Sequence, residues 1–501
     1  MESSGVRQLL GPRSIWNTGE AEGIGPIVNQ VDGIRMIPPA DDKVPLGHVN
    51  LAVASERESP AINWSRSFID RRLERDKIRF ICVAILALNL ALAAISFATF
   101  DGTRTVFGPP PCTDFAGFYA AGRILRAYSP SRVYDLELQD RVYHEVLPEL
   151  PLHTKLPFVY PPFFSLIFEP FAALPYTQAC LLWMVLSALL YLVGLAALWG
   201  TRQAIPAGEW PMVFLLAFSF QPFLECWLSG QTSVFGFAAM AWALRCESLG
   251  RSFRAGLFIS FCLYKPPLLV LIVPLLIVAR RWRILLGFVT GAAGLAGISL
   301  LSFGWHGCLA YAHLASAFSR LINSNTVAIP RWKYIDLNNF LGLLCGGQTP
   351  ASVALWAAGV LAATPWLARG WWAYGRSNPD QKTLLWATVL TWTLVLNIYV
   401  GAYDATLATI AALMTADVLV RRTGQIAGAL GAGFREVLAL LYLVPWISQH
   451  VARSTQFQPF TLVLIAFGVY QLRLTRSTAP APEAEEPRHV LESACYVSGD
   501  R

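Results

Sequence analysis

Long uncharged apolar runs recur along this sequence and constrain its fold more than any other feature. Four of them are 80–100, 177–200, 284–304 and 383–403, each about twenty residues or longer. A helix of about 20 apolar residues crosses the roughly 30 Å hydrocarbon core of a bilayer. Because backbone polar groups in lipid must be bonded within the protein, helices are the expected form of such runs. We therefore predict an all-α integral membrane protein.

The composition agrees with this interpretation. Hydrophobic residues make up 55% of the chain and charged residues only 14%, whereas a soluble globular chain carries about 25% charged residues. The formal net charge is +7, but the lysines and arginines occur in short clusters between the apolar runs. Such clusters indicate membrane topology, so the positive charge does not predict a nucleic-acid partner.

The basic clusters also set the predicted orientation. The run 71–79 is rich in arginine and precedes the first apolar segment, which places the N-terminus in the cytoplasm. With that orientation basic residues fall in every inner turn, as the positive-inside rule requires. We predict about twelve spans, near 78–100, 177–200, 210–228, 231–246, 254–264, 266–279, 284–304, 351–369, 383–402, 404–420, 431–449 and 456–472.

Two tails flank the predicted bundle, which covers residues 78–472. Residues 1–77 and 473–501 mix Gly, Pro, Ser and charges without helical or strand periodicity, which is typical of disordered segments. Both tails are expected in the cytoplasm. The predicted location is the plasma membrane, which the chain crosses many times.

The segment 101–176, after the first span, is too long for a simple connector. Apolar residues recur at helical spacing in 115–125 and 136–146, which predicts helices on the membrane surface. The apolar segment 163–174 is too short to cross a bilayer and is expected to be interfacial or re-entrant. Asp114 precedes the first of these helices. A carboxylate there needs water or a polar partner, so we predict a catalytic base, with a helix N-cap as the alternative role.

Lys265 stands between two predicted spans, 254–264 and 266–279, that are each too short to cross alone. Pro266 and Pro267 follow it, and proline interrupts a helix. We expect a pair of short helices with Lys265 at their apex. A single kinked helix is the alternative.

Cysteines give little guidance to the fold. The chain has nine, without a C-x-x-C pair. Four of them lie in apolar segments, where a small buried side chain is the expected role. A bridge from Cys112 to Cys308 or Cys345 is possible, because these three fall in loops on the predicted outer side. The four cysteines in apolar segments are Cys82, Cys180, Cys226 and Cys262.

An ordered series of short motifs carries a resemblance to a known family. The series is Asp114-Phe115-x-x-Phe118-Tyr119-x-x-Gly122, Tyr134-Asp135, Tyr160-Pro161-Pro162, Gly230-Gln231, Gly256 with Lys265-Pro266, and Tyr403-Asp404. In order and spacing, over residues 80–420, it resembles glycosyltransferase family 87. The stretch 336–340, Asp-Leu-Asn-Asn-Phe, departs from the family pattern, in which a sequence closer to Asn-Gln-Ser is expected.

The resemblance implies a GT-C type polytopic bundle with a large extracytoplasmic loop after the first span. It also implies a transferase that moves a sugar, expected to be mannose, from a polyprenyl-phosphate carrier to a hydroxyl of a glycolipid or glycan on the extracytoplasmic side. Membrane lipids are the other expected partners, and the oligomeric state stays open. Phosphate leaves without protonation, so one carboxylate suffices, unlike in glycoside hydrolysis. Asp114 is expected to take the acceptor proton, with inversion at the sugar.

The implied reaction also needs a cation for the departing phosphate. Lys265 suits this role, and a snorkelling lysine at the interface is the alternative. Arg331 and His313 are expected as further phosphate contacts, with solvated loop charges as the alternative. Glu225, at a span end, is either an interfacial residue or a substrate contact. The residues expected to bind sugar are Tyr160, Gln231, Tyr403 and Asp404.

No metal site and no cofactor are expected. An Asp-x-Asp motif of the kind that holds a metal for nucleotide sugars does not occur in an outer loop, and Asp135-x-Glu137 is the nearest approach. A phosphate-binding P-loop motif is also lacking.

Two other functions stay open. A lipid-linked sugar transporter or flippase would place charges near mid-span and show repeated halves, which we do not find. A noncatalytic membrane protein of envelope synthesis would keep Asp114 and Lys265 apart. Catalysis predicts instead that these two residues line one outer cavity.

Overall fold

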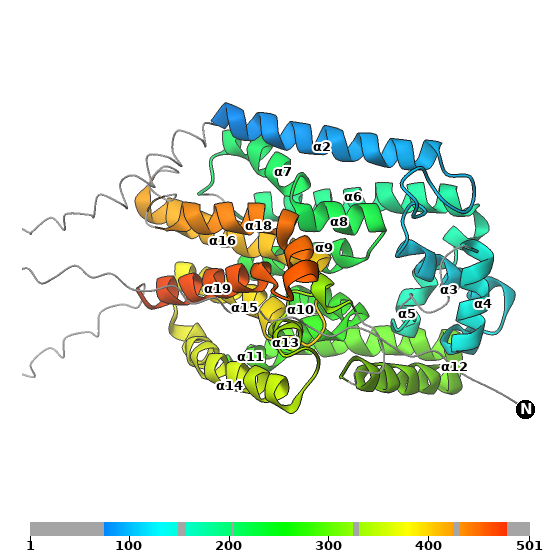
Figure 1. Ribbon diagram of the computed structural model, residues 1–501. Helices are drawn as coiled ribbons and strands as arrows, with labels where there is room; N and C mark the ends of the chain where they lie inside the picture. Colours follow the sequence, from blue (N-terminus) through cyan, green and yellow to red (C-terminus); the bar gives the residue numbers. More distant parts are fainter. Residues whose placement is uncertain are drawn as a thin grey trace, which may run out of the picture. The chain divides into compact units, whose positions relative to one another are not determined.

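The apolar runs of the sequence form helices (Figure 1). The computed structural model describes residues 75–148, 157–202, 204–323, 330–424, 431 and 433–477. Within these residues the fold is helical, and β contacts are limited to two isolated bridges. The α-helices are α2 (Arg75–Ala98), α3 (Phe115–Ala127), α4 (Leu136–Val146), α5 (Pro162–Ser165), α6 (Tyr176–Trp199), α7 (Trp210–Phe218), α8 (Gln221–Ser229), α9 (Ser233–Ser248), α10 (Ser252–Ser260), α11 (Ile272–Val278), α12 (Trp282–Asn323), α13 (Leu337–Leu344), α14 (Pro350–Trp372), α15 (Pro379–Val395), α16 (Thr406–Thr423), α18 (Phe434–Thr455) and α19 (Pro459–Ser477). The 3-10 helices are η1 (Pro130–Tyr134), η2 (Leu166–Phe168), η3 (Phe171–Ala173), η4 (Ala207–Glu209), η5 (Phe261–Tyr264), η6 (Pro266–Leu269), η7 (Arg331–Lys333), η8 (Tyr374–Arg376) and η9 (Ala402–Ala405).

Five helical segments of the described chain are long and apolar enough to cross a membrane. They are Arg75–Ala98, Tyr176–Trp199, Trp282–Phe318, Pro350–Trp372 and Ala402–Thr423. A sixth results if α7 and α8, which meet at a bend of 54°, form one broken span. Each of the other predicted spans has a helix at its position. The prediction of an all-helical membrane protein is confirmed, whereas the number of twelve spans stays a prediction.

The predicted break at Lys265 is confirmed. Helix α10 ends at Ser260 and is followed directly by η5, which ends at Tyr264, and η6 begins at Pro266. Lys265 itself has a non-helical backbone, with φ −135° and ψ 80°. The residue before a proline is disfavoured in the α conformation, so Pro266 explains why the chain turns at this lysine.

Helices α10 and α12 cross at two glycines. A Cβ on Gly256 would lie 2.0 Å from Ile284 O, and one on Gly287 would lie 2.0 Å from Phe253 O. Only glycine allows two backbones to approach this closely, as at many helix crossings in membranes. This crossing anchors the helix that leads into Lys265.

The segment between α2 and α6 packs as a cluster of short helices (Figure 1). Helix α3 contacts α4, η1, η2, η3 and α6, and most of its residues are buried. The helices predicted in 115–125 and 136–146 are confirmed, and their position on the membrane surface stays a prediction. The apolar segment 163–174 forms three short helices, α5, η2 and η3.

One disulfide corrects the sequence interpretation. Cys112 is bonded to Cys180, not to Cys308 or Cys345, and the two Cα atoms are 6.4 Å apart. Cys180 lies in an apolar segment, which predicted a buried, unpaired side chain. It stands near the start of α6, however, where this helix meets the loop that carries Cys112. Cys82, Cys226 and Cys262 are buried and free, as predicted.

The two predicted tails lie almost wholly outside the described residues. Helix α2 begins at Arg75 and α19 ends at Ser477. Both helices therefore extend beyond the predicted limits of the bundle at residues 78 and 472.

Candidate functional site

Asp114 lies where the start of α3 meets the end of α8. It occupies the N-cap position of α3, but its carboxylate makes no cap hydrogen bond to the helix. Instead Gln231 Nε2 donates to Asp114 Oδ2 at 3.0 Å, and the backbone N–H of Asp114 donates to Ser229 O at 3.0 Å. Asp114 thus occupies the N-cap position that the alternative predicted, but its side chain does not cap the helix. Asp114 Oδ1 has no hydrogen bond to a described residue.

Gly230 makes this junction possible. It ends α8 with φ 76° and ψ 31°, a left-handed conformation that favours glycine. A Cβ at this position would lie 2.5 Å from Phe115 Cβ, so only glycine lets α8 approach α3 so closely. Its carbonyl accepts a hydrogen bond from Trp183 Nε1 at 3.0 Å, and the Trp183 ring stacks on Phe115. The turn that carries Gln231 is therefore held against the residue that follows Asp114.

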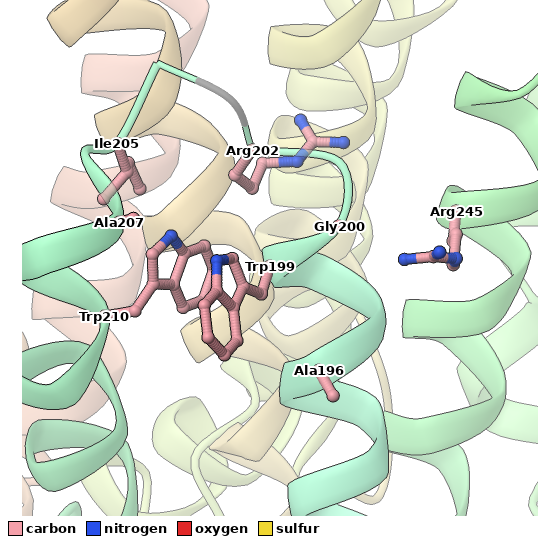
Figure 2. A pocket seen from close by; sticks show the side chains of 8 residues that line it. All are labelled: Ala196, Trp199, Gly200, Arg202, Ile205, Ala207, Trp210 and Arg245. Atoms are coloured by element: carbon pink, nitrogen blue, oxygen red, sulfur yellow. The ribbon is translucent and has the colours of Figure 1, made fainter.

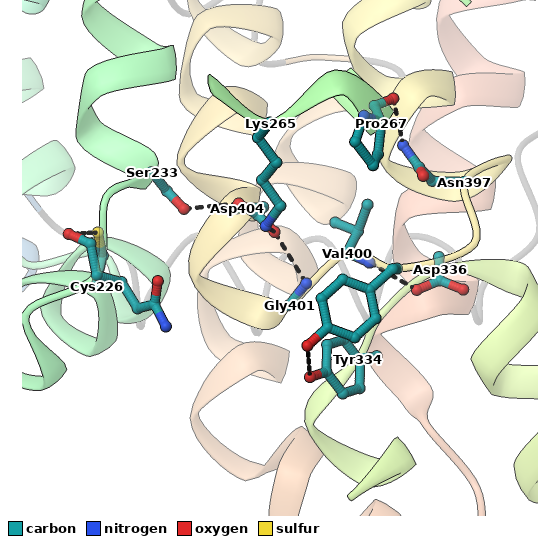
Figure 3. A network of polar contacts seen from close by, with 12 residues as sticks. Cys226, Ser233, Lys265, Pro267, Tyr334, Asp336, Asn397, Val400, Gly401 and Asp404 are labelled. Carbon is teal, nitrogen blue, oxygen red and sulfur yellow. Dashed lines mark hydrogen bonds and ion pairs between the residues drawn. The ribbon is translucent and has the colours of Figure 1, made fainter. Parts of the chain in front are cut away.

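Lys265 and Asp404 form a buried ion pair. Lys265 Nζ lies 2.5 Å from Asp404 Oδ2, and the side chains are 9% and 1% exposed. Ser233 Oγ donates to Asp404 Oδ1 at 2.6 Å, and the Gly401 N–H donates to Oδ2 at 2.9 Å. Figure 3 shows the Lys265 and Ser233 side chains converging on Asp404. A buried charge needs such pairing and hydrogen bonding, and both predicted site residues have it.

Tyr403 covers the Lys265 ammonium. Lys265 Nζ lies 5.1 Å from the centre of the Tyr403 ring, within the range of a cation–π contact. An ammonium has three N–H donors. One is directed at Asp404, so further donors remain for another acceptor.

Tyr160 packs against α3, the helix that begins directly after Asp114. Its carbonyl accepts a hydrogen bond from Tyr134 Oη at 2.9 Å, and its ring packs on Phe118 of α3. Burial raises the pKa of Tyr160 above its usual value, and the charges of Asp404 and Asp114 raise it further. The phenol is therefore within electrostatic range of both carboxylates.

Arg331 and His313 lie outside these contacts. Arg331 Nη1 donates to Asn339 Oδ1 at 3.2 Å, at the start of η7. His313 is exposed on α12, beyond the break at Gly304, where φ is 63° and ψ is 177°. Neither side chain has a contact with Lys265 or Asp404 that would support its predicted role.

The stretch that departs from the family pattern has a structural role. The buried carboxylate of Asp336 accepts hydrogen bonds from the Val400 N–H at 2.9 Å and from Asn339 Nδ2 at 2.9 Å. Ile335 donates to Val400 O at 2.9 Å. Burial raises the pKa of Asp336 from 3.8 to about 6, although these hydrogen bonds oppose the change. Asp336 thereby fixes the segment that precedes Asp404.

Sequence reasoning missed both Asp336 and Ser233 as supports of the site. Each is a single polar residue beside an apolar run. Ser233 lies 171 positions from Asp404, so no local pattern could pair them. The short distance between Gln231 and Ser233 in the sequence was the available signal.

A separate cavity of about 550 Å³ lies at the C-terminal end of α6 (Figure 2). Its two arginines already have structural partners. Arg202 pairs with Asp417 at 3.8 Å, and Arg245 Nη1 donates to Ala197 O at 3.3 Å, near the end of α6. None of the predicted site residues lines this cavity. Its lining residues are Ala196, Trp199, Gly200, Arg202, Ile205, Ala207, Trp210 and Arg245.

Comparison with known proteins gives one match. Residues 158–397 match the family model of glycosyltransferase family 87. This range includes Tyr160, Gln231 and Lys265, whereas Asp114 and Asp404 lie outside it. No curated protein and no solved structure matches the chain significantly. Over these residues, which are just under half of the chain, the protein is similar to glycosyltransferase family 87, and its apolar helices indicate a membrane protein.

Proposed function

We propose that this protein is a membrane glycosyltransferase that moves mannose from a polyprenyl-phosphate carrier to a hydroxyl of a glycolipid or glycan, with Asp114 as the general base. In this reaction the acceptor oxygen attacks C1 of the sugar from the face opposite the phosphate. The new C1–O bond forms as the C1–O bond to phosphate breaks. The acceptor proton passes to the Asp114 carboxylate, and the polyprenyl phosphate leaves with the electron pair. A β-linked donor then yields an α-linked product.

One observation carries the assignment of the base. The Asp114 carboxylate is not used as a helix cap, and Gln231 bonds only one of its oxygens. A general base must be within hydrogen-bond reach of the proton it takes, and the second oxygen meets that need. Gln231 fixes the orientation of the carboxylate, which favours a productive geometry over a freely rotating side chain.

Lys265 is our candidate for stabilising the departing phosphate. A positive group aimed at the charge that develops in the transition state is among the strongest catalytic devices in proteins. Asp404 and Tyr403 contact the ammonium, and Ser233 in turn holds the Asp404 carboxylate. The charges of Asp404 and Asp114 both act on Tyr160, and this supports a common polar region for the acid and the cation. This closeness supports catalysis over a noncatalytic membrane partner.

The remaining assignments follow from the same reaction. Tyr160, Gln231, Tyr403 and Asp404 are proposed to contact sugar or to hold residues that do. Arg331 and His313 stay proposed contacts of the donor phosphate. We place the site on the extracytoplasmic side of the plasma membrane, because the basic turns of the sequence then face the cytoplasm.

Reconstitution tests this function. Purified protein is incubated with synthetic polyprenyl-phosphate-mannose and a lipid extract of the host, and products are analysed by mass spectrometry. We expect a lipid heavier by one hexose with wild-type protein and none with Asp114→Asn. The matched control is Asp101→Asn, which removes an exposed acid of the same loop and should retain activity.

The possible outcomes separate the parts of the proposal. Product from both wild type and Asp114→Asn would retain the transferase and remove Asp114 as base. Product only with another carrier-linked sugar would reject mannose. No product with any such donor would reject the proposed reaction.

A further inference from the structure

A polar cluster on α8 takes no part in the site described above. Glu225 Oε2 accepts hydrogen bonds from Gln221 Nε2 at 2.8 Å and from Gln449 Nε2 at 2.6 Å. Gln221 lies one helical turn before Glu225, and Gln449 comes from α18. Two helices far apart in sequence thus contribute to one carboxylate–amide group among otherwise apolar residues.

Unsatisfied acceptors accompany this cluster. The side-chain oxygens of Gln221 and Gln231 are buried and have no hydrogen-bond partner among the described residues. A buried acceptor without a donor is destabilising. Both amide nitrogens are already directed at carboxylates, Glu225 and Asp114 respectively. The two oxygens thus lack a donor among the described residues, and the hydroxyl groups of a ligand would be suitable donors.

The cluster is also close to the proposed base. The Glu225 carboxylate is within electrostatic range of Asp114 and of Lys333. Glu225 lies in the middle of α8, and this helix ends at Ser229, whose carbonyl accepts a hydrogen bond from the Asp114 backbone N–H. The Glu225 cluster and Asp114 therefore flank the C-terminal half of one short helix.

The charges around Glu225 favour a neutral ligand over an anionic one. Glu225 and Asp114 are two carboxylates against one lysine, so an anionic group would be repelled at this position. Carboxylates and amide oxygens accept hydrogen bonds from neutral hydroxyls. The cation proposed for the donor phosphate, Lys265, belongs to the other part of the site. The Glu225 cluster thus suits the acceptor rather than the phosphate-bearing donor.

We infer that Gln221, Glu225, Gln449 and the Gln231 side-chain oxygen form an acceptor subsite, which binds hydroxyls of a neutral sugar residue and orients one of them toward Asp114. This inference rests on the proposed function for its role in transfer. The residues are positioning and specificity residues, because the proton is taken by Asp114.

Binding without transfer tests the subsite first. The protein is purified in a detergent without a sugar head group, and its thermal unfolding midpoint is measured with octyl α-mannoside or octyl glucuronide. We expect the neutral mannoside to raise the midpoint of wild-type protein and the anionic glucuronide to leave it unchanged. Glu225→Gln and Gln449→Leu should each weaken mannoside binding about tenfold or more. His450→Leu, an exposed neighbour on α18, is the matched control.

Kinetics then test the role in transfer. At saturating donor, Glu225→Gln and Gln449→Leu should raise the acceptor KM about tenfold or more, and the donor KM should stay within about twofold. Equal effects on both KM values, or equal binding of mannoside by variants and wild type, would overturn the subsite. Mannoside binding that depends on Glu225 in a protein without transferase activity would support the subsite and reject the proposed reaction. The two failures are thus distinguishable.

Discussion

Lys265 Nζ and Asp404 Oδ2 lie 2.5 Å apart, although 139 positions separate these residues in the sequence. The contact joins the helix break after η5 to η9, and neither partner is appreciably exposed to solvent. Removing one member of a buried pair leaves an uncompensated charge, which is far more damaging than removing both.

We therefore expect Lys265→Met and Asp404→Leu each to lower the free energy of unfolding by roughly 3–5 kcal/mol. The double variant should lose much less than the sum of the two. Equilibrium denaturation in mixed micelles measures this double-mutant cycle. The exposed pair Arg132–Asp135 is the control, with an expected contribution below about 1 kcal/mol. Additive losses for Lys265 and Asp404 would show that the pair is not coupled.

Gly230→Ala should impair both stability and transfer. The new Cβ would lie 2.5 Å from Phe115 Cβ in a backbone conformation with φ 76°. Gly250→Ala is a matched control, because Gly250 has φ 73° but no atom within 4 Å of a Cβ. Backbone strain is therefore similar in both variants, and destabilisation of Gly250→Ala should be about 1 kcal/mol. A larger loss of unfolding free energy for Gly230→Ala, together with a reduced transfer rate, would be due to the contact with α3. Equal losses of stability in the two variants would contradict a role for this contact.

The disulfide should stabilise the loop that carries Asp114. Cys112 and Cys180 are 68 positions apart, and a bridge over such a distance typically contributes about 2–4 kcal/mol. Cys180→Ser should therefore lower the unfolding midpoint, and Cys345→Ser should not. Peptide mapping without reductant should recover a fragment that links Cys112 to Cys180. Recovery of Cys112 linked to Cys345 or Cys308 instead would reject the observed pairing.

Asp336 predicts a pH dependence of stability. Its pKa is raised from 3.8 to about 6 by burial, so between these values the native protein holds a proton that the unfolded chain has lost. The contribution of Asp336 to stability is thus largest below pH 4, falls as pH rises to about 6, and is constant above it.

Unfolding midpoints of wild type and Asp336→Asn at pH 4, 5, 6 and 7 test this sign. The difference between the two proteins should change between about pH 4 and 6 and stay constant from 6 to 7, because the amide does not titrate. A difference that changes only above pH 6 would be inconsistent with the raised pKa.

Local patterns in the sequence were sufficient to predict the helices and the break at Lys265. Uncharged runs determine where helices form in lipid, and Pro266 makes an interruption predictable from one position. Helix existence is therefore the part of the fold that sequence alone describes well. The number of spans depends on length and tilt, which local composition does not determine.

Pairing across the chain was not predictable in the same way. Lys265 and Asp404 were each expected in the site, but their mutual contact depends on how η5 and η9 pack. Cys180 was misjudged because an apolar neighbourhood does not reveal how close a residue lies to a helix end. Local rules would let the Asp114 side chain cap α3, but the structure pairs it instead with Gln231, from the turn after α8.

The bond between Cys112 and Cys180 also bears on which side of the membrane the protein works. Disulfides persist in oxidising compartments and are rare in the reducing cytosol. Cys112 stands two residues before Asp114, so the same covalent link that anchors the proposed base argues for its exposure outside the cytosol. This argument is independent of the arginine distribution and leads to the same orientation. A host that cannot oxidise thiols outside its cytosol is expected to yield protein in which the segment carrying Asp114 is poorly anchored.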